Sequence, residues 1–370
     1  MRIGVDAREL GGRPTGVGRY LRELLLHWEA SPACAGNDLV LFSPHTSPEM
    51  RPTSASAGAR LHWERVAGTG GTLWEQRDLA RAARAARLDV LFSPAYTSPL
   101  RLSMPNVLAM HDVSFAAHPE WYGWRHGVRL RTLARWCGRR AHTVLTLTQF
   151  SASEIDRHLG VPATRIRVIP LAVDYHDAPP AAGAAAAPAP VVLFVGSIFE
   201  RRHLPLLVDG VIRARRDLPD LRLDVIGENR TAPRQDLVAL AQSLGAADAV
   251  RLRDYVTDAE LEQAYASAGV FAFLSAYEGF GLTPLEAMRH GLPTVVLDTA
   301  VAREVYGPGA WYVPAGDAGA VAAALVSLLR DPTQRASQAA AGIDVAARYR
   351  WQDAARATWD ALVAAGSRRS

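Results

Sequence analysis

Apolar runs alternate along the chain with longer stretches in which apolar and polar residues follow a helical period. Short uninterrupted apolar runs are typical of strands that are buried on both faces of a parallel sheet. We therefore predict strands over residues 1–7, 39–43, 90–93, 106–110, 143–148, 191–195, 221–226, 270–274 and 294–297. One predicted helix begins over residues 20–27, and further helical patterns cover residues 74–87, 151–160 and 351–365. This alternation predicts an α/β fold with parallel sheets.

A low-complexity segment interrupts the pattern near the middle of the chain. Residues 177–190 read DAPPAAGAAAAPAP, a composition that cannot build a packed core. We predict a first domain over 1–175, a linker over 176–190, a second domain over 191–350, and a final segment over 351–370 that returns to the first domain. Since ligands bind beyond the carboxyl ends of parallel strands, two doubly wound domains of this kind would face each other across a cleft that holds the site.

The absence of lysine excludes several classes of enzyme. All 41 basic residues are arginines. Enzymes that need a Schiff-base lysine, including those dependent on pyridoxal phosphate, are therefore excluded. The P-loop nucleotidases are excluded as well, because their phosphate loop carries a lysine. Any phosphate group must then be bound by arginine, by backbone N–H groups or by a helix N-terminus.

Charge and cysteine content limit the cellular compartments and the classes of partner that we expect for the protein. The net charge of +4 is mild and predicts no nucleic-acid partner. Cys34 and Cys137 are the only cysteines, too few for a disulfide framework or a cysteine metal site. The charged start of the chain and the lack of a long uncharged apolar run predict neither a secretory signal nor a membrane span. We expect a cytoplasmic protein without a metal.

The segment 269–296 carries the most informative chemistry. An apolar run is followed by a turn with Gly279 and Gly281, and Thr283 and Pro284 then open a predicted helix. Glycines let backbone N–H groups approach a ligand closely, and a helix N-terminus adds positive potential. This combination predicts a binding site for a diphosphate.

Two carboxylates belong to this segment. Glu278 stands at the end of the predicted strand, where it would face the cleft, and its alternative is a solvated loop position. Glu286 is predicted in the first turn of the helix, placed to accept hydrogen bonds from ribose hydroxyls. Its alternative is a capping box with Thr283, since the spacing Thr-x-x-Glu is typical of one.

The same string resembles the Glu-x7-Glu signature of the family 4 glycosyltransferases, which have the GT-B fold and retain anomeric configuration. The matching residues are Glu278, Gly279, Phe280, Gly281, Leu285, Glu286, Ala287, Met288, Gly291 and Pro293. The resemblance implies that Glu278 is catalytic. It also implies that Gly279, Phe280, Gly281, Leu282 and Glu286 bind a nucleotide diphosphate sugar as co-substrate.

The first half of the chain extends the resemblance. Gly16 lies in the segment TGVGRY, which looks like the glycine loop that approaches the donor diphosphate or the acceptor. Trp74 and Glu75 begin a WEQ triplet similar to that of mannosyltransferase-like members, and they would lie on the acceptor side. His111 and Asp112 look like the family's HD pair, with His111 near the transferred sugar and Asp112 on the acceptor side. A strand–helix turn, a helix start and a structural histidine are the respective alternatives.

The second half carries two further motifs. The family's phosphate-binding lysine falls on Arg202, preceded by Arg201 and followed by His203 where asparagine is usual. Arginine keeps the positive charge and presents a fork that matches phosphate oxygens. Tyr255 and Val256 would lie along the nucleobase.

These assignments imply a mechanism. Arg202 and Arg201 would stabilise negative charge on the departing diphosphate, and Glu278 would hold the sugar hydroxyls, with His111 as the third catalytic residue. No second carboxylate well placed to act as a base is evident, which favours a front-face route over a glutamate nucleophile. The chain has no Asp-x-Asp motif, so a metal-dependent GT-A design is not expected. The donor would be GDP-mannose or another nucleotide hexose, and the acceptor a hydroxyl of a glycan, a lipid-linked sugar or a small molecule.

Two alternative functions remain open. A nucleotide-sugar epimerase or hydrolase of the same fold would share the phosphate contacts, and so would a non-catalytic nucleotide-sugar-binding protein.

Residues 121–142 interleave arginines with tryptophans over a helical length. This stretch could lie on the inner face of a membrane, next to a lipid-linked acceptor. It could equally be an ordinary helix with a solvated arginine face and Leu130, Leu133 and Ala134 packed inward.

Overall fold

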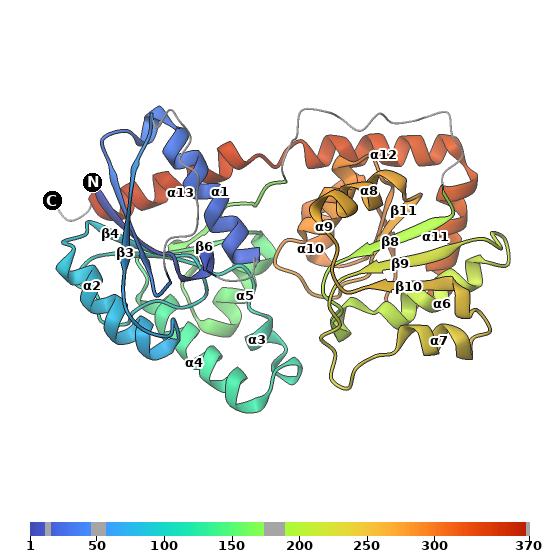
Figure 1. Ribbon diagram of the computed structural model, residues 1–370, viewed down its shortest axis with the longest axis horizontal. Coiled ribbons are helices and arrows are strands. Elements are labelled where there is room, and N and C mark those ends of the chain that lie inside the picture. The colour runs from blue at the N-terminus through green and yellow to red at the C-terminus, as the bar shows by residue number, and fades with distance from the viewer. Residues whose placement is uncertain (12–15, 46–56, 174–188, 368–370) are drawn as a thin grey trace. The chain divides into compact units, whose positions relative to one another are not determined.

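The computed structural model describes residues 1–11, 16–45, 57–173 and 189–367. The chain divides into two compact units, which are described separately (Figure 1). The first comprises Met1–Leu171 and Arg350–Ser370, and the second comprises Ala172–Tyr349. Nearly all of the predicted linker lies outside the described residues.

The first unit is built on a parallel sheet of seven strands in the order β3-β2-β1-β4-β5-β6-β7. Its strands are β1 (Arg2–Asp6), β2 (Asp38–Ser43), β3 (Arg60–Arg65), β4 (Val90–Ser93), β5 (Asn106–Ala109), β6 (Thr143–Thr146) and β7 (Ile166–Val168). The central strands β4 and β5 are buried along their whole length, as their apolar runs predict. The edge strands β3 and β7 were not predicted, because one is rich in charged residues and the other is very short.

Helices cover both faces of this sheet. They are α1 (Gly16–Ala30), α2 (Ala80–Ala85), α3 (Ser114–Ala117), α4 (Trp124–Arg140), α5 (Gln149–Leu159) and α13 (Trp351–Gly366). Residues Trp74–Leu79 form a π-helix that runs directly into α2, where the pattern predicted a single regular helix. Such wide turns are rare and often occur at functional sites.

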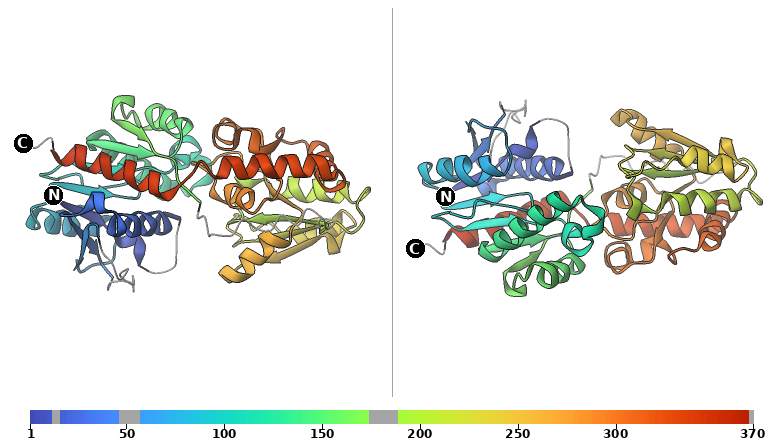
Figure 2. Two further views of the ribbon diagram at one scale, coloured as in Figure 1. Left: turned by 90° about the horizontal axis from the view of Figure 1, so that it is seen from above. Right: turned by 90° about the horizontal axis from the view of Figure 1, so that it is seen from below.

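The last helix of the chain belongs to the first unit, as predicted. α13 packs on α1 and lies against β4, β5 and β6 (Figure 2). The indole nitrogen of Trp28 donates a hydrogen bond to the carbonyl of Ala355 at 2.9 Å, and the rings of Trp28 and Trp359 lie 5.6 Å apart. Large aromatic side chains bury much apolar surface, so this contact fixes the helix to its sheet.

The second unit has a parallel sheet of six strands in the order β10-β9-β8-β11-β12-β13. The strands are β8 (Val191–Val195), β9 (Arg222–Ile226), β10 (Val250–Arg253), β11 (Val270–Phe273), β12 (Thr294–Leu297) and β13 (Ala310–Val313). Its helices are α6 (Leu204–Ala214), α7 (Leu237–Ser243), α8 (Asp258–Ser267), α9 (Leu282–Arg289), α10 (Ala300–Tyr306), α11 (Ala318–Arg330) and α12 (Pro332–Ala346). The two parallel sheets confirm the predicted α/β class. None of the helices in the described part of the chain has the length and hydrophobicity needed to cross a membrane.

Candidate functional site

Arg202 and Glu278 meet at the carboxyl edge of the second sheet. Arg202 lies in the short helix that follows β8, and Glu278 lies in the turn that follows β11. Nε and Nη2 of Arg202 both lie 3.0 Å from Oε1 of Glu278, and Ser275 donates its hydroxyl to the same oxygen at 2.9 Å. Nη1 of Arg202 donates to the carbonyl of Ser197 at 2.8 Å. The two predicted site residues are therefore held as an ion pair whose geometry is set by their neighbours.

The glycine turn is anchored from behind by a tyrosine. Gly281 has a φ of 86°, and a Cβ atom at this position would lie 2.0 Å from the hydroxyl oxygen of Tyr306. This hydroxyl donates to the carbonyl oxygens of Gly281 at 3.0 Å and Phe280 at 3.3 Å. Only glycine satisfies both the left-handed backbone and this close approach. Tyr306 belongs to no recognisable motif, so sequence reasoning missed its role.

The helix that follows the turn begins earlier than predicted. Gly281 occupies the N-cap position of α9, no side chain caps the helix, and Glu286 falls in the second turn. The predicted capping box between Thr283 and Glu286 is therefore wrong. Instead, the hydroxyl of Tyr265 donates to Oε2 of Glu286 at 3.1 Å. The binding of a ribose by Glu286 stays a prediction.

The other residues predicted to bind the sugar donor differ in the solvent exposure of their side chains. The side chain of Phe280 is buried and meets the ring of Tyr349 edge to face at 5.1 Å, so this residue can offer a ligand only its backbone. Gly279 is buried and Leu282 opens α9. Tyr255 is 86% exposed just beyond β10, as a residue available for stacking would be. Val256 packs against the core of the unit.

The arginine segment before α6 is also held by its surroundings. The guanidinium of Arg201 lies over the ring of Phe199, 4.3 Å from its centre, and the carbonyl of Arg201 accepts from the amide of Ala276 at 2.8 Å. This backbone bond joins the arginine segment to the turn that carries Glu278. His203 is the N-cap of α6 and has a φ of 46°. Asparagine is among the residues that tolerate this conformation best, which accounts for its use there in the family.

In the first unit, His111 is buried. Its Nε2 hydrogen-bonds to the carbonyl of Pro94 at 2.8 Å, and its ring meets the ring of Tyr20 edge to face at 4.9 Å. Burial lowers the pKa of His111, with the Pro94 carbonyl and Asp112 acting in the opposite direction. We infer that the imidazole is neutral, with hydrogen on Nε2 and a lone pair on Nδ1.

Asp112 and Gly16 occupy different kinds of position. Oδ1 of Asp112 accepts from the amide and the hydroxyl of Ser114 at 2.8 and 2.6 Å, so this carboxylate organises the start of α3. Gly16 is the first residue of α1, and a Cβ atom at this position would meet nothing within 4 Å. Packing therefore does not require glycine at position 16, which leaves ligand approach or backbone freedom as its reason.

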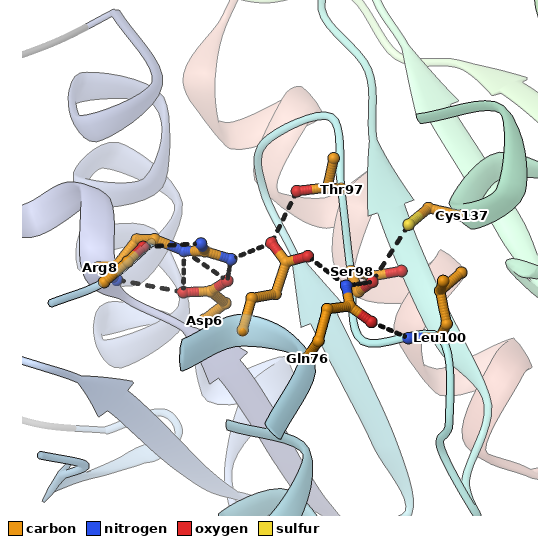
Figure 3. A network of polar contacts seen from close by, with 9 residues as sticks. Asp6, Arg8, Gln76, Thr97, Ser98, Leu100 and Cys137 are labelled. Atoms are coloured by element: carbon orange, nitrogen blue, oxygen red, sulfur yellow. Dashed lines mark hydrogen bonds and ion pairs between the residues drawn. The ribbon is translucent and has the colours of Figure 1, made fainter. Parts of the chain in front are cut away.

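The WEQ triplet is part of a buried polar network rather than an open surface (Figure 3). The indole of Trp74 is buried and donates to the carbonyl of Val66 at 2.9 Å. Glu75, equally buried, forms an ion pair with Arg8, which also pairs with Asp6. The two carboxylates raise the pKa of Arg8 although burial by itself would lower it. The predicted direct contact of Trp74 and Glu75 with an acceptor is thus at odds with their burial, and a supporting role fits better.

The network also fixes the loop between β4 and β5. Glu75 accepts from the hydroxyl of Thr97 at 2.6 Å. Gln76 donates to the carbonyl of Ser98 at 2.9 Å and accepts from the amide of Leu100 at 2.9 Å. The same loop supplies the Pro94 carbonyl that holds His111. Sequence reasoning missed Asp6, Arg8 and Thr97, because nothing in their local pattern shows that they meet residues about 20 to 70 positions away.

The basic stretch 121–142 contains α4. Ala134 is buried, and Leu130 and Leu133 pack against the core as the ordinary-helix alternative predicted. Two tryptophans on the same helix remain open to solvent, Trp124 at 77% and Trp136 at 53% exposure. Exposed aromatic rings beside arginines are one feature of helices that lie on a membrane surface.

Comparison with known proteins covers most of the chain. Residues 14–177 match the family described as Glycosyltransferase Family 4, and residues 189–331 match Glycosyl transferases group 1. The O-antigen chain mannosyltransferase B of Escherichia coli is 28% identical over 306 residues, 78% of either chain. A D-inositol 3-phosphate glycosyltransferase of Kineococcus radiotolerans is 34% identical over 224 residues, which span 54% of this chain and about half (52%) of that protein.

Solved structures agree on the fold. HepE of Anabaena, solved with UDP and glucose, superposes with a TM-score of 0.70 at 18% identity, covering 98% of this chain and 99% of that one. Sucrose-phosphate synthase of Thermosynechococcus elongatus gives a TM-score of 0.72 at 20% identity, covering 97% and 98%. With the two parallel sheets and the returning helix α13, these structures show that the chain has the GT-B fold. The two family matches, over residues 14–177 and 189–331, show that it belongs to the family 4 (group 1) glycosyltransferases, enzymes that transfer a sugar from a nucleotide sugar.

Proposed function

We propose that the chain transfers a hexose, with retention of configuration, from a nucleotide diphosphate sugar to a hydroxyl of a glycan, a lipid-linked sugar or a small molecule. The observation that carries this proposal is the Arg202–Glu278 pair at the carboxyl edge of the second sheet. It brings a phosphate-matching cation and a carboxylate to one place, beside a turn of backbone amides. That is the chemistry needed when charge separates between a leaving diphosphate and a sugar.

In this proposal the second unit binds the donor. Arg202 and Arg201 stabilise the diphosphate, the turn from Gly279 to Leu282 offers backbone N–H groups, and Glu286 holds the ribose. Tyr255 and Val256 lie along the base. Glu278 holds the sugar hydroxyls, and the leaving phosphate accepts the proton of the acceptor. His111 in the first unit supports the transferred sugar, and the acceptor binds to the same unit near Asp112.

A mannose donor is the version that we favour. The WEQ triplet points this way, and several relatives, two of which follow, have names that specify mannosyl transfer. One is the Escherichia coli mannosyltransferase. The other is a GDP-mannose:cellobiosyl-diphosphopolyprenol alpha-mannosyltransferase of Komagataeibacter xylinus, 28% identical over 228 residues that span 58% of this chain and 55% of that protein.

Calorimetric titration of the protein with GDP, UDP, TDP and ADP tests the donor assignment. We expect one diphosphate to bind at least tenfold more tightly than the others, with GDP as the favoured base. Absence of binding by all four would overturn the donor site. Consumption of the matching nucleotide sugar without any acceptor would support the epimerase or hydrolase alternative, and binding without turnover on any acceptor would support the non-catalytic one.

We further propose that the protein works in the cytoplasm and touches the inner face of the membrane through α4. The exposed rings of Trp124 and Trp136, on a helix rich in arginine, support this proposal. In a flotation assay the protein should rise with anionic vesicles, and the double variant Trp124→Ser/Trp136→Ser should remain at the bottom of the gradient. Equal flotation of both proteins would show that the two tryptophans of α4 do not mediate membrane binding.

A further inference from the structure

A cavity of about 690 Å³ opens at the amino edge of the first sheet. Asn106 and Thr143, the first residues of β5 and β6, line it, as do Arg165 and Arg167 on either side of the start of β7. His111 follows the opposite, carboxyl end of β5. The cavity is therefore separate from the edge of the sheet to which the transfer reaction is assigned.

The lining of the cavity is strongly cationic. Arg140, Arg165 and Arg167 all contribute to it, and no aspartate or glutamate does. Within the described ranges, no carboxylate forms an ion pair with any of the three. Arg140 and Arg165 each donate one Nη1 bond to a backbone carbonyl, at 3.3 and 2.9 Å, which leaves the rest of each fork available. Three uncompensated guanidinium groups around one cavity favour a multiply charged anion.

Two buried polar side chains in the wall have no protein partner. Asn106 is 6% exposed and Ser98 is 2% exposed, and both line the cavity. No residue in the described part of the chain hydrogen-bonds to the carboxamide of Asn106 or to the hydroxyl of Ser98. Neither side chain is among the polar groups that are both shielded from solvent and unpaired, so their polar atoms are open to the cavity. A ligand in the cavity can therefore hydrogen-bond to them without displacing a protein partner.

One part of the wall is apolar. Leu100, Leu102 and Met104 contribute to it, beside two prolines. A site with guanidinium groups on one side and aliphatic groups on the other suits a phosphate that is attached to a carbon body, since the fork of arginine matches phosphate oxygens in pairs.

We propose that this cavity is a second ligand site, which binds a phosphate monoester or diester. Arg165 and Arg167 bind the phosphate oxygens together with Arg140, and Asn106 and Ser98 bind the ester oxygen or a neighbouring hydroxyl. The phosphate could come from a soluble metabolite or from a lipid headgroup, and the two sources share this chemistry. The proposal does not depend on the proposed transferase mechanism.

The test compares a cavity variant with a variant of equal charge. Arg165→Gln/Arg167→Gln removes two of the guanidinium groups, and Arg216→Gln/Arg234→Gln removes two exposed arginines of the second unit. Glycerol 3-phosphate is titrated into each protein in phosphate-free buffer and followed by thermal shift, because a ligand that binds the folded state raises Tm. In parallel, each protein is mixed with vesicles of phosphatidylcholine, with and without phosphatidic acid.

A soluble source predicts that glycerol 3-phosphate stabilises the wild type and the control, and that the cavity variant loses at least tenfold in affinity. A lipid source predicts the same difference between the two variants in binding to phosphatidic acid vesicles, with no response to glycerol 3-phosphate. Equal behaviour of the cavity variant and the control with both probes overturns the proposal, as does a wild type that binds neither.

Asn106→Val supplies an independent measurement. Valine suits a strand and removes the carboxamide from the cavity wall, so the variant should keep a Tm close to that of the wild type without ligand, and should bind the effective probe several-fold more weakly. A loss of stability with unchanged binding would mean that Asn106 has a structural partner and no ligand.

Discussion

Arg202 directs both Nε and Nη2 at a single oxygen of Glu278, each at 3.0 Å. Oε1 also accepts the hydroxyl of Ser275, whereas Oε2 has no hydrogen-bond partner in the described part of the chain. A carboxylate held firmly by one oxygen keeps the other for a substrate. In the proposed mechanism Arg202 thus has two roles, since it orients Glu278 and supplies positive charge for the diphosphate.

Replacing Glu278 should affect turnover more than donor binding. Glu278→Gln keeps the shape and removes the charge, so we expect kcat to fall by about 100-fold or more while the Kd of the nucleotide diphosphate changes by less than about threefold. Arg202→Gln should weaken both. Steady-state kinetics and calorimetry separate the two quantities. A matched loss of Tm in both variants with proportionate loss of activity would mean that the pair is only structural.

Glu286 should contribute to donor affinity, and Tyr265 should act through it. Glu286→Ala is expected to weaken nucleotide binding by about tenfold, which corresponds to about 1.4 kcal/mol. Tyr265→Phe removes only the hydroxyl that orients this carboxylate, so its effect should be smaller and in the same direction. In the double variant the two losses should not add, because both act on one contact. Fully additive losses would contradict this coupling.

Two glycines offer a matched comparison of packing and ligand approach. Gly281→Ala places a methyl group against the Tyr306 hydroxyl in a left-handed backbone, and we expect it to lower stability by about 1–3 kcal/mol. Adding Tyr306→Phe should restore part of this loss. Gly16→Ala meets open space and should leave Tm unchanged. If Gly16 approaches a ligand, its alanine variant will nevertheless lose activity, whereas an unchanged KM and kcat would leave Gly16 as an ordinary turn.

The buried imidazole of His111 predicts a pH dependence of stability. Because burial lowers its pKa in the folded state, the unfolded chain binds a proton first as the pH falls through the usual range near 6.5. The stabilising contribution of neutral His111 is thus complete above that range and is lost below it, with a slope of at most about 1.4 kcal/mol per pH unit. His111→Gln should flatten the curve of unfolding free energy between about pH 6.5 and 5. An identical curve would contradict a neutral, buried His111.

Replacing Arg8 alone should destabilise the first unit more than replacing both Arg8 and Glu75. Arg8→Met leaves two carboxylates buried beside each other, and breaking a buried pair in this way costs about 3–5 kcal/mol. The double variant Arg8→Met/Glu75→Gln makes one of the two carboxyl groups neutral. It should therefore recover part of the lost free energy of unfolding, measured by chemical denaturation. Equal instability of the single and the double variant would show that packing, rather than charge, accounts for the effect.

The sequence predicted what depends on local pattern. Buried central strands such as β8 follow from continuous apolar runs, and the turn around Gly281 follows from its glycines. The edge strand β3 was missed because Arg60–Arg65 has only two apolar residues, Leu61 and Trp63, among charged and polar ones. Contacts such as those of Arg8 with Glu75 and of Tyr265 with Glu286 join elements that only the sheet topology brings together. For the same reason the capping box was predicted from spacing alone, and the structure replaced it with a tertiary partner.

The place of α13 has a consequence for biosynthesis. The first unit needs Trp351–Gly366 to cover Trp28 and one face of its sheet, yet these residues leave the ribosome after the whole of the second unit. The second unit, Ala172–Tyr349, is by contrast complete before they are made. In the order of synthesis, the unit that is begun first is thus the one that is finished last, and until then it exposes an apolar surface for chaperones to protect.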